Sequence, residues 1–118
     1  TSDAGSTYLL PRIVGYPKAY ELLATGDRVN AEEAHRIGLV TSVAAHGKLQ
    51  GETQAFAERL AQGPPNTLAI LKRSLRLAES ASLLDTLENE ANMQALCMLG
   101  GEHAEGVAAF LDKRPPAF

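Results

Sequence analysis

The chain has 118 residues with a net charge of −3, of which 45% are hydrophobic and 21% charged, an ordinary balance for a globular protein. The slight negative charge argues against a general attraction to nucleic acid or anionic membranes, and no apolar run approaches the length of a transmembrane helix. A single cysteine, Cys97, excludes an internal disulfide and fits a reducing compartment, so we expect a cytoplasmic protein without membrane or nucleic-acid partners.

Short amphipathic segments, each followed by a glycine, make up the first forty residues. A glycine accepts the left-handed conformation that commonly ends a helix. The spacing predicts a helix over Thr7–Val14, a second that starts near Pro17, and a third over Ala31–Ile37 with Asn30 as its N-cap. The glycines that end them are Gly15, Gly26 and Gly38.

The segment Leu39–Val43 is rich in β-branched residues, which favours a strand. It is the one convincing strand pattern in the chain. A lone strand leaves its N–H and C=O groups without ladder partners, so it requires a sheet that this sequence does not supply. We therefore expect a mainly α fold with one short strand over 39–43, belonging to a longer protein.

Longer helices are predicted after His46. The chain is broken between them by Gly63-Pro64-Pro65 and by Gly100-Gly101, and Pro115-Pro116 stops the last helix. Ser82 is the expected N-cap of the third of these helices. The expected helices are Leu49–Gln62, a segment that begins at Asn66 or Thr67, Leu83–Leu99, and Glu102–Lys113.

Asp3 and Lys113 are the side chains that could carry chemistry. Asp3 precedes a predicted helix, where a carboxylate can either cap the helix or transfer protons. Lys113 lies with Arg114 at the end of the last predicted helix, as a solvated cation or as a phosphate contact. The histidines are too far apart for helix-spaced metal ligation, so no metal site is predicted.

Four segments carry a family signal: Ser2–Gly15, Tyr20–Ala31, Glu33-Ala34 followed by Gly38–Val40, and Glu105–Arg114. In this order and at this spacing they resemble the crotonase superfamily of enoyl-CoA hydratases and isomerases. Each is a weak signal alone, and the combination is specific.

The resemblance implies an α/β, ClpP-like spiral fold with a C-terminal helical trimerisation domain for the whole protein. Residues 1–45 would end the crotonase core, and residues 46–118 would form the helical oligomerisation region of a trimer or hexamer. The substrate would be an acyl-CoA thioester of fatty acid metabolism, with coenzyme A as part of the substrate and no separate cofactor. The paired N–H groups of the oxyanion hole and the two glutamates typical of hydratases would lie upstream of Thr1.

Asp3 matches the acid–base position of isomerase-like members, although Ser2 replaces the usual proline and many hydratases have glycine in place of this aspartate. Lys113 matches a lysine of the closing helix that contacts a CoA phosphate. The sequence departs from the family where Gly5-Ser6 replaces Gly-Gly. It departs again where His103-Ala104-Glu105 lacks the usual Asp-x-Arg-Glu pattern, which argues against a local salt bridge there.

The function implied is reversible hydration or double-bond isomerisation of 2-enoyl-CoA thioesters, with the 118-residue chain alone inactive. The alternative is a helical self-association module without catalytic activity. The two hypotheses differ in one observable, turnover of crotonyl-CoA.

Overall fold

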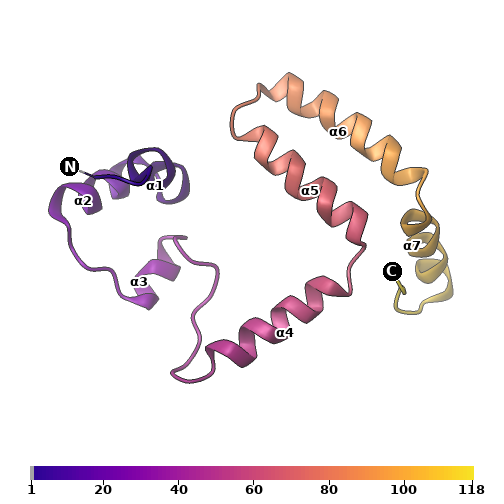
Figure 1. The fold of residues 1–118 in the computed structure, drawn as a ribbon, viewed down its shortest axis with the longest axis horizontal. Helices are drawn as coiled ribbons and strands as arrows, with labels where there is room; N and C mark the ends of the chain where they lie inside the picture. The colour runs from indigo at the N-terminus through magenta and orange to yellow at the C-terminus, as the bar shows by residue number, and fades with distance from the viewer. Residues whose placement is uncertain (1) are drawn as a thin grey trace. The chain divides into compact units, whose positions relative to one another are not determined.

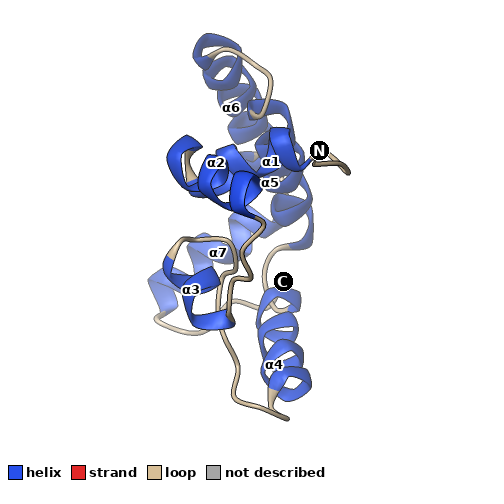
Figure 2. Cartoon of the chain, turned by 90° about the vertical axis from the view of Figure 1, so that its left-hand side faces the viewer, coloured by secondary structure: helices blue, strands red, loops and turns tan. Residues whose placement is uncertain are grey.

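The computed structural model describes residues 2–118, in which every regular element is an α-helix and no strand occurs (Figure 2). The mainly α fold predicted for this part of the protein is confirmed. The chain divides into one unit that ends at Gln50 and a second that begins at Gly51. The helices, labelled in Figure 1, are α1 (Ser6–Val14), α2 (Tyr16–Thr25), α3 (Ala31–Arg36), α4 (Leu49–Ala61), α5 (Pro65–Ala78), α6 (Leu83–Met98) and α7 (Gly101–Asp112).

Two helix ends in the first unit follow the glycine pattern, whereas α3 ends one residue earlier than predicted, with Ile37 and not Gly38 as its C-cap. Gly15, which has φ 81°, ends α1 and donates its N–H to Pro11 O, and Gly26, which has φ 68°, ends α2 and donates to Leu22 O. Asn30 caps α3, because its side chain accepts a hydrogen bond of 2.8 Å from the Glu33 amide. Within this unit α1 packs against α2. The predictions for Gly15, Gly26 and Asn30 are confirmed. Each depends on interactions within one helical turn, so residue type and spacing are enough to make it.

The strand predicted over Leu39–Val43 is wrong, since these residues form turns and irregular backbone. The amides of Leu39 and Val40 both turn back to the carbonyl of Ala34 in α3, at 2.8 and 3.3 Å. The carbonyl of Val40 lies 3.4 Å from Nδ1 of His35. The β-branched composition favours extension, but these residues have no partner strand in the described range, so their polar groups complete the end of α3 instead.

In the second unit, α5 and α6 form an antiparallel pair, and α6 packs in turn against α7 (Figure 1). Ser82 caps α6 as predicted. Its hydroxyl accepts from the Asp85 amide at 3.2 Å, and the Asp85 carboxylate accepts from the Ser82 amide at 3.3 Å, which completes a capping box. Helix α5 begins at Pro65, slightly before the predicted start at Asn66 or Thr67.

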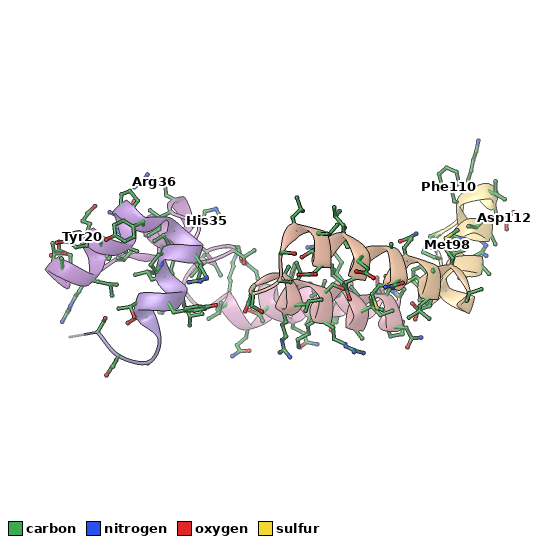
Figure 3. The ribbon with its side chains drawn as sticks, turned by 90° about the horizontal axis from the view of Figure 1, so that it is seen from above. Tyr20, His35, Arg36, Met98, Phe110 and Asp112 are labelled. Carbon is green, nitrogen blue, oxygen red and sulfur yellow. The ribbon has the colours of Figure 1, made fainter. Side chains whose placement is uncertain are left out.

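The buried side chains among the described residues are all alanines: Ala19 and Ala34 in the first unit and Ala109 in the second. The large apolar side chains of the predicted helical stripes remain exposed; Leu75, for example, is 62% exposed. Phe110, which projects from α7, is 82% exposed (Figure 3). Each unit therefore presents apolar faces that its own helices do not cover.

The boundary between the units lies a few residues after the predicted division at 45 and 46. The roles expected for the two parts, end of a core and oligomerisation region, stay predictions. No helix of the described range is both long enough and apolar enough to cross a bilayer.

Candidate functional site

Asp3 lies in a tight turn just before α1. Its carbonyl accepts hydrogen bonds from the Ser6 amide at 3.0 Å and from the Ser6 hydroxyl at 2.7 Å. Ala4 (φ 52°) and Gly5 (φ 79°) both take the left-handed conformation, which reverses the chain into the helix. Gly5 is the N-cap of α1 and no side chain of residues 2–118 forms a capping hydrogen bond there, so the interpretation of Asp3 as a helix cap is wrong. Its carboxylate is exposed.

A shallow groove of about 330 Å³ lies between α1 and α2, beside the turn that carries Asp3. The ring centroids of Tyr16 and Tyr20 are 6.3 Å apart and the rings are stacked along one side of the groove; Figure 3 labels Tyr20. The groove is lined by Ser2, Thr7, Pro11, Tyr16, Ala19, Tyr20, Leu23 and Ala24. Ser2 precedes Asp3 directly in the chain. The groove combines an apolar surface with a few hydroxyl groups, and the residue that follows its lining residue Ser2 carries an exposed carboxylate, able to accept or donate a proton.

Charges in the first unit pair across α2 and α3. Arg36, labelled in Figure 3, donates two hydrogen bonds of 2.6 Å to the Glu33 carboxylate, and Lys18 of α2 lies 3.7 Å from the same group. The hydrogen bonds from Arg36, aided by Lys18, hold the pKa of Glu33 below its ordinary value. This cluster joins the two helices on an exposed surface, and its charges are satisfied.

Lys113 ends α7 in an unusual backbone conformation. It is the C-cap and has φ 53° and ψ 39°, the left-handed region that a non-glycine residue seldom adopts. Its amide donates to Phe110 O at 3.3 Å, and the next amide, of Arg114, donates to Ala109 O at 3.0 Å. The Lys113 side chain is exposed and forms no ion pair within residues 2–118.

Glu105 binds the residues that follow Lys113, which contradicts the prediction of no local salt bridge in this segment. Arg114 donates two hydrogen bonds to the Glu105 carboxylate, at 2.6 and 3.0 Å, and the Ala117 amide donates a third at 2.7 Å. The hydrogen bonds from Arg114 and Ala117 lower the pKa of Glu105 to about 2. Sequence spacing missed this pair because residues nine apart do not share a helix face.

Glu102 caps a distant helix. Its carboxylate accepts hydrogen bonds from the amides of Asn66 and Thr67, at 2.7 and 3.0 Å, and from the Thr67 hydroxyl at 2.8 Å. Burial acts to raise the pKa of Glu102, but the hydrogen bonds from Asn66 and Thr67 outweigh it and hold the pKa below its ordinary value. The first turn of α7 is thereby fastened to the start of α5. No local sequence signal could reveal a contact that spans so many residues.

A second groove, of about 580 Å³, follows α5 and α6. It is bordered by Ile70, Leu71 and Leu75 from α5, and by Leu87 and Met93 from α6. Cys97 is half-buried and also borders it, in agreement with a packing role. This groove is a largely apolar face of the second unit.

The described residues contain no group of three or more His, Cys, Asp or Glu side chains arranged to hold a metal ion. Asp3 lies in the first unit and Lys113 in the second. Each has an exposed side chain: Asp3 carries a carboxylate in the turn before α1, and Lys113 carries an ammonium at the end of α7.

Known proteins resemble this chain over almost its full length. The 1,2-epoxyphenylacetyl-CoA isomerase of Escherichia coli (strain K12) is 36% identical over 116 residues, which cover 98% of this chain and 44% of the relative. The crotonyl-CoA hydratase of Syntrophomonas wolfei subsp. wolfei (strain DSM 2245B / Goettingen) is 34% identical over 118 residues, 100% of this chain and 45% of the relative. The chain thus spans less than half the length of these relatives.

The folds agree as well. The crystal structure of an enoyl-CoA hydratase/isomerase from Cupriavidus metallidurans CH34 matches 98% of this chain and 44% of its own, with a TM-score of 0.90 and 36% sequence identity. The family model described as enoyl-CoA hydratase/isomerase matches residues 1–118. Because sequence and fold agree along the whole chain, the chain belongs to the enoyl-CoA hydratase/isomerase family.

Proposed function

We propose that this chain is the C-terminal part of an acyl-CoA enzyme that hydrates 2-enoyl-CoA thioesters or shifts their double bond. The match of the family model to residues 1–118 carries the proposal. The enolate formed from a thioester would be stabilised by backbone N–H groups of the longer protein, and the 118-residue chain alone is expected to be inactive.

Asp3 is proposed as the acid–base group. The exposed carboxylate, the absence of a capping bond and the neighbouring apolar groove support this role. In an isomerisation, a carboxylate removes a proton from one carbon and returns it to another, so the acyl chain must lie against it. The α1–α2 groove offers such an apolar surface.

Lys113 is proposed to bind a phosphate of coenzyme A. Its exposed ammonium at the end of α7, which forms no ion pair with the residues that the structure describes, supports this role. A single ammonium binds phosphate as a point charge, so the contact is sensitive to salt. Within this proposal the chain supplies one proton-transfer group and one anion-binding group.

A chimera tests the proposal. This chain would replace the matching segment of the S. wolfei crotonyl-CoA hydratase, and crotonyl-CoA turnover would be measured for the chimera and for the 118-residue chain alone. We expect turnover by the chimera and none by the chain alone. Robust turnover by the purified chain, free of full-length enzyme, would contradict the proposal that the oxyanion hole lies outside it.

Two substitutions in an active chimera separate the roles. Asp3→Asn should lower kcat by roughly 100-fold with little change in KM, because it removes an acid–base group. Lys113→Ala should raise KM, more at low than at high ionic strength. Asp27→Asn and Lys72→Ala, which change exposed charges elsewhere, are the matched controls. A silent Asp3→Asn variant would remove Asp3 from the mechanism.

A helical self-association module remains the second candidate. The observation that favours it is the absence of any large buried side chain in the described residues, together with the apolar groove along α5 and α6. We propose that these faces are covered in a trimer or hexamer of the longer protein. An inactive chimera that still associates would favour this candidate over the enzyme.

A further inference from the structure

Two cations stand side by side at the end of α7, but they are held differently. Arg114 is bound to Glu105 through both of its terminal nitrogens, and its Nε lies 3.5 Å from the Asp112 carboxylate. Lys113 has no such partner within the described residues. Of the two cations, Lys113 is therefore the one whose charge is not already matched by a neighbouring carboxylate.

Hydrogen bonds before and after Lys113 in the chain stabilise its backbone conformation. Before it, the carbonyls of Ala109 and Phe110 accept the amides of Arg114 and Lys113. After it, Glu105 holds the Arg114 guanidinium and the Ala117 amide, which folds the tail back onto α7. The left-handed conformation at Lys113 is unfavourable for a lysine, so it persists only when contacts on both sides hold the chain there.

We propose that Glu105 is a positioning residue for Lys113: by clamping Arg114 and Ala117 it fixes Lys113 in the left-handed conformation and leaves its ammonium alone to meet a phosphate of the acyl-CoA substrate. This inference rests on the proposed function of Lys113. It adds that the anion site requires a carboxylate, a group that by simple electrostatics repels the ligand.

Two possible roles of Glu105 predict opposite effects of its substitution on the affinity for an anion. If Glu105 acted only as a nearby negative charge, replacing it by glutamine would free Arg114 as a second cation and tighten the binding of an anion. If Glu105 positions Lys113, the same substitution releases the tail and weakens binding. A residue that served stability alone would change neither the local conformation of Lys113 nor the affinity in protein that is still folded.

The test uses the 118-residue chain, two nuclear magnetic resonance measurements and coenzyme A itself as the probe. The first measurement is the intraresidue amide-to-Hα NOE of Lys113, which is strong at positive φ because the two protons are close. The second is a titration with coenzyme A at low ionic strength. Both measurements are made on the wild type, on Glu105→Gln, and on Glu88→Gln, a control that removes the same charge from α6. Lys113→Ala is used for the titration alone.

We expect Glu105→Gln to lose the strong NOE at Lys113 and to weaken coenzyme A binding by about two- to fivefold, the range for losing one exposed charged contact. Glu88→Gln should change neither. If Glu105→Gln reduces helix content, the charge-swapped pair Glu105→Arg with Arg114→Glu restores the ion pair at the same net charge. It does not restore the hydrogen bond from the Ala117 amide, because arginine has no acceptor, so it should recover part of the NOE.

Failure of this inference and failure of the proposed function give different results. If Lys113→Ala weakens binding but Glu105→Gln leaves the NOE and the affinity unchanged, or tightens binding, Glu105 does not position Lys113. If Lys113→Ala leaves binding unchanged, or the wild-type chain does not bind coenzyme A, the phosphate role of Lys113 is wrong, and the inference about Glu105 is overturned with it.

Discussion

Alanine in place of glycine at three positions should change stability in different directions. A Cβ built at Gly15, Gly26 or Gly51 meets no other atom within 4 Å, apart from its own chain neighbours and, for the helical Gly51, the nearby backbone of its own helix. Steric crowding therefore cannot explain a difference between the variants. What differs is the backbone: Gly26 has φ 68° and ψ 19°, and Gly15 has φ 81° and ψ 155°. Gly51 lies inside α4 without a positive φ.

The magnitudes follow from these angles. Gly26 lies in the left-handed helical region, where an alanine costs about 1–2 kcal/mol. Gly15 lies in a region that is essentially restricted to glycine, so Gly15→Ala should cost about as much or more, up to roughly 3 kcal/mol. Gly51→Ala should instead stabilise α4 by about 0.5–1 kcal/mol, because alanine loses less backbone entropy in a helix.

Urea unfolding followed by far-ultraviolet circular dichroism measures these changes, with each variant compared with the wild type. We expect Gly15→Ala and Gly26→Ala to lower the midpoint and Gly51→Ala to raise it. If all three substitutions shift the midpoint in the same direction, or Gly15→Ala is neutral, the backbone argument is wrong.

Three further predictions concern the helix cap, the clamp at Glu105 and the exposed groove. Ser82→Ala removes the acceptor for the Asp85 amide and should cost about 1 kcal/mol in the same urea assay, whereas Ser80→Ala, outside the cap, should cost little. Ionised Glu105 is stabilising, so its contribution is complete above the ordinary pKa of 4.5 and is lost as the pH falls toward about 2. Melting temperatures of wild type and Glu105→Gln should therefore differ at neutral pH and converge in acid; a constant difference would contradict this. The double variant Leu71→Gln with Leu75→Gln should reduce self-association in sedimentation, because both leucines border the α5–α6 groove and are 51% and 62% exposed. An unchanged sedimentation profile would show that this groove is not an interface.

The family and the roles of single residues differ in how far the sequence predictions were tested. The family expected from four short segments is confirmed by the match over residues 1–118. The roles of Asp3 and Lys113 stay predictions. The interpretation of Asp3 as a cap of α1 is wrong, because Gly5 is the N-cap.

The sequence by itself determined where most helices begin and end. Asn30 and Ser82 accept hydrogen bonds from amides three residues later, and Gly15 and Gly26 end helices through amides that reach four residues back. Contacts of this range lie within one helical turn, so residue type and spacing are enough to predict them.

Only the tertiary structure decided the remaining features. Leu39 and Val40 have the composition of a strand, but a strand needs a partner, and here their amides complete the end of α3. Glu102 reaches Asn66 and Thr67, 36 and 35 residues away, and Glu105 reaches Arg114 across the end of its helix. Helical periodicity predicts neighbours three and four residues apart, whereas these partners meet only because the chain turns at Gly100 and again at Lys113.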